Sequence, residues 1–538
     1  METLDPERFS ETEQAPLRTL IDELLEAQQS LSAVERFSQR HAGDAIPAQQ
    51  KYYRELIPLS SPGPGEQYAF RVNLDACTGC KSCVSGCHSL NGLDEGESWR
   101  QVGLLVGDEE TESYQQTVTA ACHHCVEPAC MHGCPVAAYD KDSITGIVRH
   151  LDDQCIGCQY CVLKCPYDVP KYHAKKGIVR KCDMCQSRLK VGEAPACVQA
   201  CPTQAIQITI IRLDEVRSVS GPDQRMIAGA FDSSYTQPTT RYHSKTSSPE
   251  HVRSANAYDL RLEPAHYPLV FMLVLTQLSV GLFAAQIVNG FWNLSGNGAG
   301  MTLLALAAAI LGVISSTLHL GRPLGAWRAF LGLRRSWLSR EILIFGAFVP
   351  AAMIYTALQC LPEFPMPMRS VATSILIVGV LVFGFSGVFS SVMIYADTQR
   401  EFWKISTTAW KFFGTTLILG GAAAALFTAS FLWIGMVMAL LPLKLALESG
   451  VFRHLQDGGM TPLGCTARIL KKKLGRLVAM RFGVAVLGMG LLVVEIFSGD
   501  SFFLRGLALV CLLTGELLER TYFFRAVKAP RMPGMAGS

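Results

Sequence analysis

The stretch CTGCKSCVSGC at residues 77–87 decides the fold of the first half of the chain, because four cysteines stand within it. Their spacing, Cys-x2-Cys-x2-Cys-x3-Cys, recurs with a following proline in CIGCQYCVLKCP at residues 155–166. Groups at 122–134 and 182–201 keep the first pair and widen the gap before the third cysteine to four and eleven residues. In chain order the cysteines are Cys77, Cys80, Cys83, Cys87, Cys122, Cys125, Cys130, Cys134, Cys155, Cys158, Cys161, Cys165, Cys182, Cys185, Cys197 and Cys201.

This repeated spacing is the one that bacterial ferredoxins use to hold iron–sulfur clusters. Three closely spaced cysteines bind one face of a cubane, and the fourth ligates the other cluster of a pair. Sixteen cysteines in four groups are therefore enough for four [4Fe-4S] clusters. One departure is that His88 replaces the proline that usually follows the fourth cysteine, here Cys87.

Disulfides and zinc are the competing uses of so many cysteines. Structural disulfides are typical of small secreted domains, but the chain starts METLDPERFSETEQ, which has neither the basic start nor the apolar run of a secretion signal. Zinc sites also use paired Cys-x2-Cys, yet they rarely add a third cysteine soon afterwards and a Cys-Pro beyond it. The sequence therefore favours clusters over both.

Short β-prone stretches flank the cysteine groups, at 68–74, 147–151, 178–181 and 205–210. Each group then lies in a loop or short helix between strands, which predicts two ferredoxin-like lobes over residues 66–215. The expected fold class is an α+β double ferredoxin-like cluster domain followed by an all-α, eight-span transmembrane bundle.

The second half of the chain is strongly apolar. Hydrophobic residues make up 49% of the chain and charged residues 17%, with a mean hydropathy of +0.24, whereas soluble domains approach a quarter charged. The polar stretch 216–264 predicts a linker, and residues 265–538 predict a membrane anchor. Runs long enough to span a bilayer lie at about 268–290, 301–319, 341–361, 370–395, 408–427, 431–447, 478–497 and 503–524.

The distribution of basic residues predicts how the bundle is oriented. Loops on one side of the eight runs, together with the C-terminal segment, carry 20 Lys and Arg residues, against 2 on the other side. An even number of spans places both termini and the cluster domain on the basic side, which is the cytoplasm. The expected location is a bacterial-type inner (plasma) membrane that the chain crosses several times.

Residues 1–65 form an acidic extension, since residues 1–60 hold eleven Asp and Glu against six Lys and Arg. Apolar residues at roughly helical spacing predict one amphipathic helix over about 15–40. The helix either packs on its own domain or serves as a docking arm for a partner subunit.

Ionisable residues at the ends of spans are candidates for function. His319 ends the second run and Glu341 begins the third, both on the side of the cluster domain. Each also has a structural interpretation: an interfacial histidine bonded to a carbonyl, and a helix-end carboxylate paired with Arg340 or Arg335. Other carboxylates near span ends are interpreted as interface charges: Asp397, Glu495, Glu516 and Glu519.

Haem is not expected in the bundle, because a b-type haem needs axial ligands within it. The histidines after residue 260 all lie outside the middle of a run: His266, His319 and His454. The near-neutral formal charge of +3 also argues against a nucleic-acid partner.

In this order the four cysteine groups resemble the iron–sulfur subunit of the dimethyl sulfoxide reductase family of molybdenum enzymes. The second half resembles the membrane anchor of the same enzymes, through HLGRPLGAWRAFLGLRRSWLSREI (319–342), SSVMIYADTQREFW (390–403) and ERTYFFRAVKAPRMPG (519–534). The resemblance covers about residues 66–530, so the chain looks like both subunits fused.

The resemblance implies a separate catalytic subunit with molybdenum on two pterin guanine dinucleotides, and it links His319 and Glu341 to quinone or quinol binding. It also implies four cluster sites. From the catalytic subunit towards the membrane these are Cys77, Cys80, Cys83 with Cys201; Cys182, Cys185, Cys197 with Cys87; Cys122, Cys125, Cys130 with Cys165; and Cys155, Cys158, Cys161 with Cys134.

Three functions follow as hypotheses. The first is an electron conduit from quinol to a molybdenum reductase of S- or N-oxides. The second is the same conduit in reverse, carrying electrons from a substrate such as sulfite into quinone, because some related enzymes face the cytoplasm as the charge count predicts here. The third is a membrane-tethered redox sensor without catalytic turnover.

Overall fold

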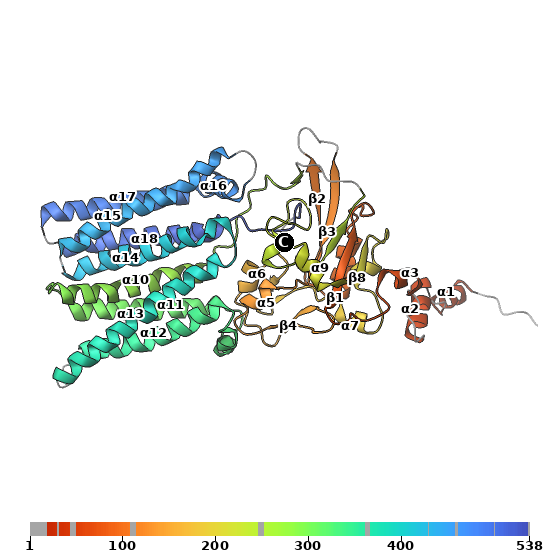
Figure 1. Cartoon of the computed structure of the whole chain (residues 1–538), viewed down its shortest axis with the longest axis horizontal. Helices are drawn as coiled ribbons and strands as arrows, with labels where there is room; N and C mark the ends of the chain where they lie inside the picture. The colour runs from red at the N-terminus through yellow and green to blue at the C-terminus, as the bar shows by residue number, and fades with distance from the viewer. Residues whose placement is uncertain are drawn as a thin grey trace, which may run out of the picture.

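The computed structural model describes residues 19–29, 32–43, 50–107, 114–245, 252–360, 366–428, 430–457, 461–499 and 501–535. A cluster domain of small sheets and short helices stands at one end, and a bundle of long helices lies at the other (Figure 1). The first part of the acidic extension, residues 1–18, lies outside the described residues.

Small sheets and hairpins build the cluster domain. The strands are β1 (Glu66–Asn73), β2 (Gln101–Gly107), β3 (Gln115–Ala120), β4 (Tyr139–Lys141), β5 (Val148–His150), β6 (Lys171–His173), β7 (Ile178–Arg180), β8 (Ile206–Arg212), β9 (Arg241–His243) and β10 (Val252–Ser254). Their pairing gives the sheets β8-β1-β9 and β10-β2-β3 and the hairpins β4-β5 and β6-β7. All four stretches that the sequence marks as β-prone contain strands.

The antiparallel pairing of β1 with β8 closes this domain. Its register places Val72 opposite Ile206, so the loop after β1 meets the chain just before β8. The short helices are α4 (Ser82–Leu90), α5 (Ala129–Gly133), α6 (Tyr160–Lys164), α7 (Gln186–Lys190), α8 (Ala196–Gln199) and α9 (Leu213–Ser218). At the meeting point α4 lies against α8, where a Cβ on Gly86 would come within 2.7 Å of the Ala200 side chain. The first and last cysteine groups are thereby brought together.

The N-terminal segment holds two helices, α1 (Leu20–Gln29) and α2 (Ala33–Gly43), where the sequence predicts one, and a short α3 (Gln50–Tyr53) follows. Each of the first two begins with a reciprocal cap. Thr19 and Asp22 exchange backbone-to-side-chain hydrogen bonds, and Ser32 and Glu35 do the same. A second capping box starts a new helix, which explains why the expected single helix is divided.

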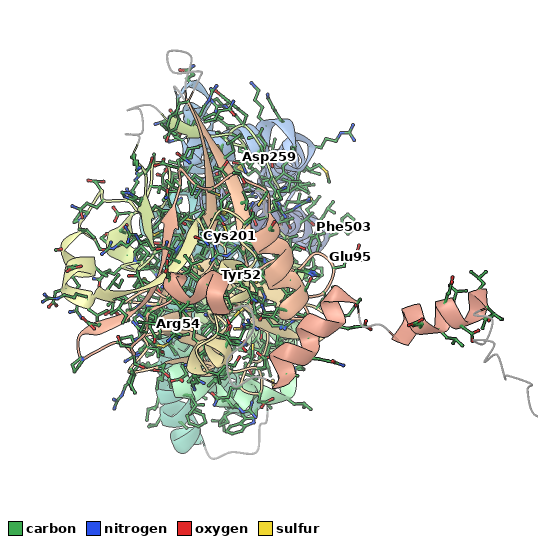
Figure 2. All side chains as sticks on the ribbon, turned by 90° about the vertical axis from the view of Figure 1, so that its right-hand side faces the viewer. Tyr52, Arg54, Glu95, Cys201, Asp259 and Phe503 are labelled. Carbon is green, nitrogen blue, oxygen red and sulfur yellow. The ribbon has the colours of Figure 1, made fainter. Side chains whose placement is uncertain are left out.

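The apolar face of α1 is exposed. Its side chains Leu20, Ile21, Leu24 and Leu25 are 50–72% exposed, so this helix does not pack on its own domain within the described residues. Figure 1 places α1 at the end of the molecule farthest from the long helices, and Figure 2 shows the same end facing the viewer with α1 standing away from the body.

Residues 216–264, expected as a linker, pack on the cluster domain in their described parts. Strand β9 adds to β1 and β10 adds to β2. The hydroxyl of Thr239 donates to the carbonyl of His123 at 2.6 Å, and that of Tyr235 donates to the carbonyl of Asp397 at 2.8 Å. The polar residues that suggested a tether therefore provide hydrogen bonds between segments far apart in the sequence.

Long helices form at every predicted apolar run. They are α10 (Tyr267–Phe291), α11 (Gly298–Thr317), α12 (Trp337–Cys360), α13 (Met366–Ala396), α14 (Ile405–Thr428), α15 (Phe431–Ser449), α17 (Gly475–Ser498) and α18 (Phe502–Arg525). A short helix, α16 (Pro462–Lys472), connects α15 to α17. Within the described residues, seven are long and apolar enough to cross a membrane, and α18 is not among them. Four charged residues precede its last turn: Arg505, Glu516, Glu519 and Arg520.

Glu516 and Glu519 are not interface charges, because both are fully buried in the bundle. Glu516 contacts Lys444 of α15 closely and accepts from Arg481 of α17 at 2.8 Å. Glu519 lies 3.3 Å from Lys411 of α14. Buried charges persist in proteins when they are paired, so these ion pairs explain how α18 lies within an apolar bundle. We call Lys411, Lys444, Glu448, Arg481, Glu516, Glu519 and Arg520 the intrabundle ion network.

The other two carboxylates that the sequence suggested as interface charges, Glu495 and Asp397, are also paired with basic residues. Glu495, only 6% exposed, lies 3.4 Å from Arg505. Asp397 lies at the junction between the two parts of the molecule, where it accepts a 2.6 Å bond from Lys164 of α6.

The loop 318–336 between α11 and α12 docks the bundle on the cluster domain. A Cβ on Gly321 would meet the Gly177 carbonyl oxygen at 2.2 Å, and one on Gly157 would meet that oxygen at 2.3 Å. The backbone nitrogen of Arg322 donates to the carbonyl of Ile156 at 3.0 Å, and Ser336 donates to the carbonyl of Gly133 at 2.7 Å. Close glycine contacts thus place the start of the anchor directly on the loops of the second and third cysteine groups.

Candidate electron-transfer site

The structure brings the sixteen cysteines together in four sets, and each set takes three residues from one sequence group and one from another. Cys201 shares a cavity with the first three cysteines of group one, and Cys165 shares one with those of group two. The thiol of Cys87 lies beside those of Cys185 and Cys197, and that of Cys134 beside Cys155 and Cys158. We call them set 1 (Cys77, Cys80, Cys83, Cys201), set 2 (Cys182, Cys185, Cys197, Cys87), set 3 (Cys122, Cys125, Cys130, Cys165) and set 4 (Cys155, Cys158, Cys161, Cys134).

The Cys-Pro turns have one common geometry. The residue three positions after the cysteine has a left-handed backbone, at Ala137, Asp168 and Gln204. In two of the turns the next backbone N–H donates to the sulfur, from Ala138 to Cys134 at 3.2 Å and from Ala205 to Cys201 at 3.3 Å. Proline disfavours a helical conformation in the residue before it, so the chain leaves the helix at the cysteine and turns back over the sulfur.

Cys87 lacks this turn because His88 follows it. Helix α4 continues through Cys87 to Leu90. The side-chain amide of Asn91 then lies 3.6 Å from the Cys87 sulfur and also donates to the Cys87 carbonyl at 2.8 Å. A side-chain donor four residues later therefore takes the place of the backbone N–H.

The donor sets fit iron–sulfur clusters better than single metal ions. In the described part of the chain no three His, Cys, Asp or Glu side chains converge closely enough to hold one ion, whereas the four thiols of set 1 and those of set 3 each line a small cavity. Burial raises the pKa of the Cys87 thiol to about 12, so such thiols ionise together only beside a compensating cation. Iron supplies that charge, and the N–H donors to sulfur are among the features that tune a cluster.

Three buried side chains lie between successive sets. Arg100 is close to thiols of sets 1 and 2. Lys181 donates to the Cys122 sulfur of set 3 at 3.5 Å and to the Cys182 carbonyl of set 2 at 2.7 Å. Tyr139 lies beside Cys130 of set 3 and Cys161 of set 4. None of the three could be predicted from the sequence, because an isolated Arg, Lys or Tyr has no spacing signature.

His319 lies where the anchor meets set 4. Its ring hydrogen-bonds to the backbone of Cys158, which agrees with the structural interpretation of a histidine bonded to a carbonyl, and burial lowers its pKa to about 4. Its ring also meets that of His266 edge-on, with centroids 5.0 Å apart. His319 therefore touches both a set 4 loop and the start of α10.

Glu341 is 5% exposed in the first turns of α12. Its partner is the hydroxyl of Ser391 on α13, not Arg340 or Arg335. Arg340 instead donates to the carbonyls of Leu333 and Arg334. Within the described part of the protein Glu341 and His319 make no contact, although Glu341 lies close to Tyr160, the residue next to Cys161 of set 4.

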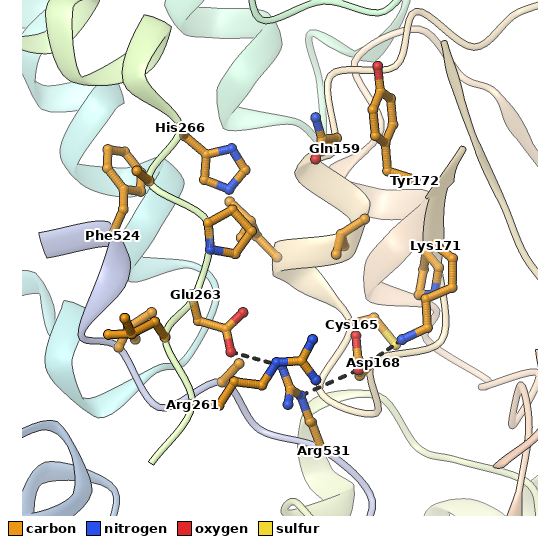
Figure 3. Close-up of a pocket in the computed structure, with 18 of the residues that line it drawn as sticks. Gln159, Cys165, Asp168, Lys171, Tyr172, Arg261, Glu263, His266, Phe524 and Arg531 are labelled. Carbon is orange, nitrogen blue, oxygen red and sulfur yellow. Dashed lines mark hydrogen bonds and ion pairs between the residues drawn. The ribbon is translucent and has the colours of Figure 1, made fainter. Parts of the chain in front are cut away.

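A cavity of about 1000 Å³ opens where the two parts of the molecule meet. Residues from α6, from the segment before α10, and from the ends of α18 and its tail line it, among them Gln159, Glu263, His266 and Phe524 (Figure 3). Arg531 bridges Glu263 at 2.8 Å and Asp168 at 3.4 Å across this space. From the sequence, His266 was a candidate only as a haem ligand, and its place here could not be predicted because the cavity is built from segments far apart in the sequence.

Comparisons with known families agree with both halves of the chain. The family of 4Fe-4S dicluster domains matches residues 114–211, and the family described as DMSO reductase anchor subunit (DmsC) matches residues 264–525. The protein is 38% identical over 182 residues to the B subunit of the anaerobic dimethyl sulfoxide reductase of Haemophilus influenzae, which covers 87% of that subunit and 32% of this protein.

Two further relatives share the cluster half. The B subunit of the anaerobic dimethyl sulfoxide reductase of Escherichia coli K12 is 36% identical over 180 residues, which is 86% of that subunit and 32% of this protein. The thiosulfate reductase electron transfer subunit PhsB of Salmonella typhi is 37% identical over 152 residues, which is 78% of that subunit and 28% of this protein. The protein therefore belongs to the dimethyl sulfoxide reductase family, as an iron–sulfur electron-transfer subunit joined in one polypeptide to a multi-pass membrane anchor.

Proposed function

We propose that this protein passes electrons between quinone or quinol in the bilayer and a separate molybdenum catalytic subunit, through four [4Fe-4S] clusters, for the reduction of an S- or N-oxide. The observation that carries the proposal is the linear order of the four sets. Arg100, Lys181 and Tyr139 link set 1 to set 2, set 2 to set 3 and set 3 to set 4, and His319 links set 4 to the anchor.

The protein's own residues provide the surroundings of this path. Sets 1 to 4 would hold the clusters, which supply one-electron transfer when bound. Buried cations and N–H donors stabilise added negative charge, and the apolar residues around the sets exclude water. Iron analysis of anaerobically purified protein should approach sixteen irons per polypeptide, because the sequence has sixteen such cysteines. About one zinc per four cysteines, without iron, would contradict the proposal.

Quinone exchange is assigned to His319 and Glu341. Quinone takes two electrons and two protons, so its site needs proton-exchanging groups near the last cluster and within reach of the bilayer. His319 touches the backbone of set 4, and Glu341 is buried beside Ser391 at the start of a span. They are not in contact, so a quinone head would have to lie between groups on two elements.

Substitutions test this assignment. We expect His319→Ala and Glu341→Gln each to slow quinone-linked electron transfer at least tenfold, about 1.4 kcal/mol of barrier, with iron content and membrane insertion unchanged. His454→Gln, a histidine paired with Asp457 away from set 4, is the matched control. Normal quinol kinetics in both variants would place the site elsewhere.

A catalytic partner is expected at the end of the cluster domain away from the bundle. Cys80 of set 1 is exposed, so a redox centre bound to a partner could approach this set directly. The uncovered apolar face of α1 lies at the same end (Figure 1). We expect Ile21→Lys with Leu25→Lys to weaken copurification of a molybdenum subunit, while Glu26→Lys, on the same helix, does not. If the double variant still copurifies with the partner, α1 is not part of the interface.

The membrane region is proposed to cross the bilayer eight times, with both ends of the region in the cytoplasm. Strand β10 precedes α10 and pairs with β2, while the tail after α18 packs on the same sheet: a Cβ on Gly103 would meet the Pro533 oxygen at 2.6 Å. A polypeptide that leaves and returns to one side crosses an even number of times, which supports α18 as an eighth span beside the seven more apolar helices. A reporter fused after Ser538 should be active in the cytoplasm, and activity only in the periplasm would reverse the orientation.

The same conduit run in reverse is a second candidate. The excess of basic residues on one side, 20 against 2, supports a cytoplasmic cluster domain by the positive-inside rule. A cytoplasmic sulfite-type dehydrogenase would deliver electrons to quinone there. Assays of the purified complex with a panel of oxides and with sulfite distinguish the two directions.

A further inference from the structure

We propose that the loop between α11 and α12 binds an anionic phospholipid, with its exposed 3₁₀ helix, η3 (Pro323–Gly332), lying among the lipid headgroups. The inference concerns the lipid around the anchor and goes beyond electron transfer, so it does not depend on where quinone binds. The occupant is a phospholipid because the loop joins two spans, exposes one apolar edge and carries only positive charge.

The position of the loop places it at the membrane surface. Helix α11 ends at Thr317 and α12 begins at Trp337, and both are long and apolar enough to cross a bilayer. Residues that connect two such helices lie at the level of the headgroups or just outside it. Figure 1 shows this connection where the long helices meet the cluster domain, far from α1.

One edge of η3 is apolar and uncovered. A 3₁₀ helix has three residues per turn, so Leu324, Trp327 and Phe330 follow one another along a single edge. Their side chains are 94%, 66% and 51% exposed, and the rings of Trp327 and Phe330 lie together with centroids 6.2 Å apart. Tryptophan is enriched where a bilayer meets water because its ring is both apolar and a hydrogen-bond donor. Such an edge fits the boundary between headgroups and acyl chains.

The rest of η3 is held against the cluster domain. Ala329 is buried, and a Cβ on Gly325 would come within 2.9 Å of the Ile156 side chain. The backbone N–H of Gly332 donates to the carbonyl of Pro135 at 2.9 Å. Since protein covers these positions, the apolar edge points away from the cluster domain.

The charge of the loop is entirely positive. Residues 318–340 hold five arginines and no Asp or Glu. Three of the arginines donate to backbone carbonyls: Arg322, Arg328 and Arg340. Arg334 and Arg335 are exposed and form no ion pair with a carboxylate within the described residues. Two adjacent guanidinium groups therefore remain for an anion, and guanidinium matches the geometry of a phosphate.

An anionic phospholipid supplies what both features need. Its phosphate is the anion for Arg334 and Arg335, and its acyl chains cover Trp327 and Phe330. Anionic membranes attract basic clusters that adjoin a span. The catalytic subunit is expected at the other end of the cluster domain, near set 1 and α1, so a lipid fits this loop better than that partner does.

The test measures lipid binding to the full-length, cluster-loaded protein in a non-ionic detergent, by native mass spectrometry. Phosphatidylglycerol should bind at least about tenfold more tightly than phosphatidylcholine, because two basic residues contribute to the contact. Arg334→Gln with Arg335→Gln should retain one phosphatidylglycerol fewer per polypeptide. Trp327→Ser with Phe330→Ser should weaken the binding of both lipids. sn-Glycerol 3-phosphate, which has the charge but no acyl chains, should not compete, and iron content should be unchanged.

The matched control is Lys471→Gln with Lys472→Gln. It removes the same charge from two exposed residues at the end of α16, on the same basic side of the bundle. If this control loses as much phosphatidylglycerol as the arginine variant does, general surface charge attracts the lipid and the site is overturned. Arg335→Gln alone serves if the arginine pair loses iron, and unchanged lipid binding in it would count against the site.

Three other results would overturn the proposal. The unaltered protein could show no preference for phosphatidylglycerol, or glycerol phosphate could displace the lipid, which would indicate a site for free anions. Loss of the molybdenum subunit from the arginine variant, with lipid binding unchanged, would identify a protein as the occupant of the loop.

Discussion

The side-chain nitrogen of Lys181 lies 3.5 Å from the sulfur of Cys122, and the same ammonium donates to the carbonyls of Val148 and Cys182. The Lys181 side chain is only 3% exposed. The two carbonyls hold its ammonium group against the thiols of set 3 and next to the backbone of set 2. A positive charge held there stabilises the reduced state of whatever redox centre the thiolates hold.

Lys181→Met should therefore lower the midpoint potential of the cluster at set 3, and that of set 2 by less. A charge-assisted hydrogen bond contributes about 1.5–3 kcal/mol, and about 1.4 kcal/mol corresponds to 59 mV for one electron, so we expect a shift of at most about 65–130 mV. Redox titration followed by EPR measures it. Lys190→Met, an exposed lysine nine positions later, is the control, and equal shifts in both variants would contradict the assignment.

Cys158→Ser should damage set 4 alone. Thiolate is the ligand that iron–sulfur clusters select, so a hydroxyl at this corner should leave a three-iron centre. Because set 4 adjoins the anchor, quinone-linked turnover should fall while a soluble dye still reaches the catalytic partner. Cys360→Ser, an exposed cysteine outside the sets, should change neither activity. Equal loss of both activities in Cys158→Ser would argue against a place for this set next to the membrane.

Gly321→Ala should uncouple the anchor from the cluster domain. The added methyl would stand 2.2 Å from the carbonyl oxygen of Gly177, a backbone atom that cannot move aside by a rotamer change. We expect normal cluster reduction by dithionite and a several-fold slower reduction by quinol, measured by stopped flow. Gly346→Ala in α12 meets nothing within 4 Å and should behave as the parent protein. If Gly321→Ala reduces its clusters with quinol at the normal rate, the contact between the two domains can shift without slowing electron transfer.

Glu516→Gln should destabilise the bundle, because it leaves Lys444 and Arg481 buried with one fewer counter-charge. Removing one partner of a buried pair costs about 3–5 kcal/mol. Replacing both members, as in Glu516→Met with Lys444→Met, should cost less than the single change. Thermal unfolding of the purified protein in detergent compares the variants. A double variant less stable than Glu516→Gln would mean that the intrabundle ion network contributes more than the pairing of its charges.

The sequence by itself determined the spacing of the cysteine groups and located the long helices to within a few residues. The reason is that both signals are local. The spacing of Cys155, Cys158 and Cys161 already matches the turns of a short loop and helix, and the apolar run at 268–290 becomes α10 at Tyr267–Phe291 because length and hydropathy suffice to define a span. The spacing of apolar residues predicted one N-terminal helix, whereas the capping pairs Thr19–Asp22 and Ser32–Glu35 start two.

Only the tertiary structure decided which charged residues are buried and which residues they pair with. Glu516 and Lys444 are 72 residues apart, and neither position shows from its neighbours that the other lies opposite it. The polar stretch before α10 became two edge strands because β1 and β2 offered unpaired edges, which no local pattern reveals. His266 and His319 meet for the same reason: the turn before α10 and the loop after α11 are adjacent only once the bundle has docked on the cluster domain.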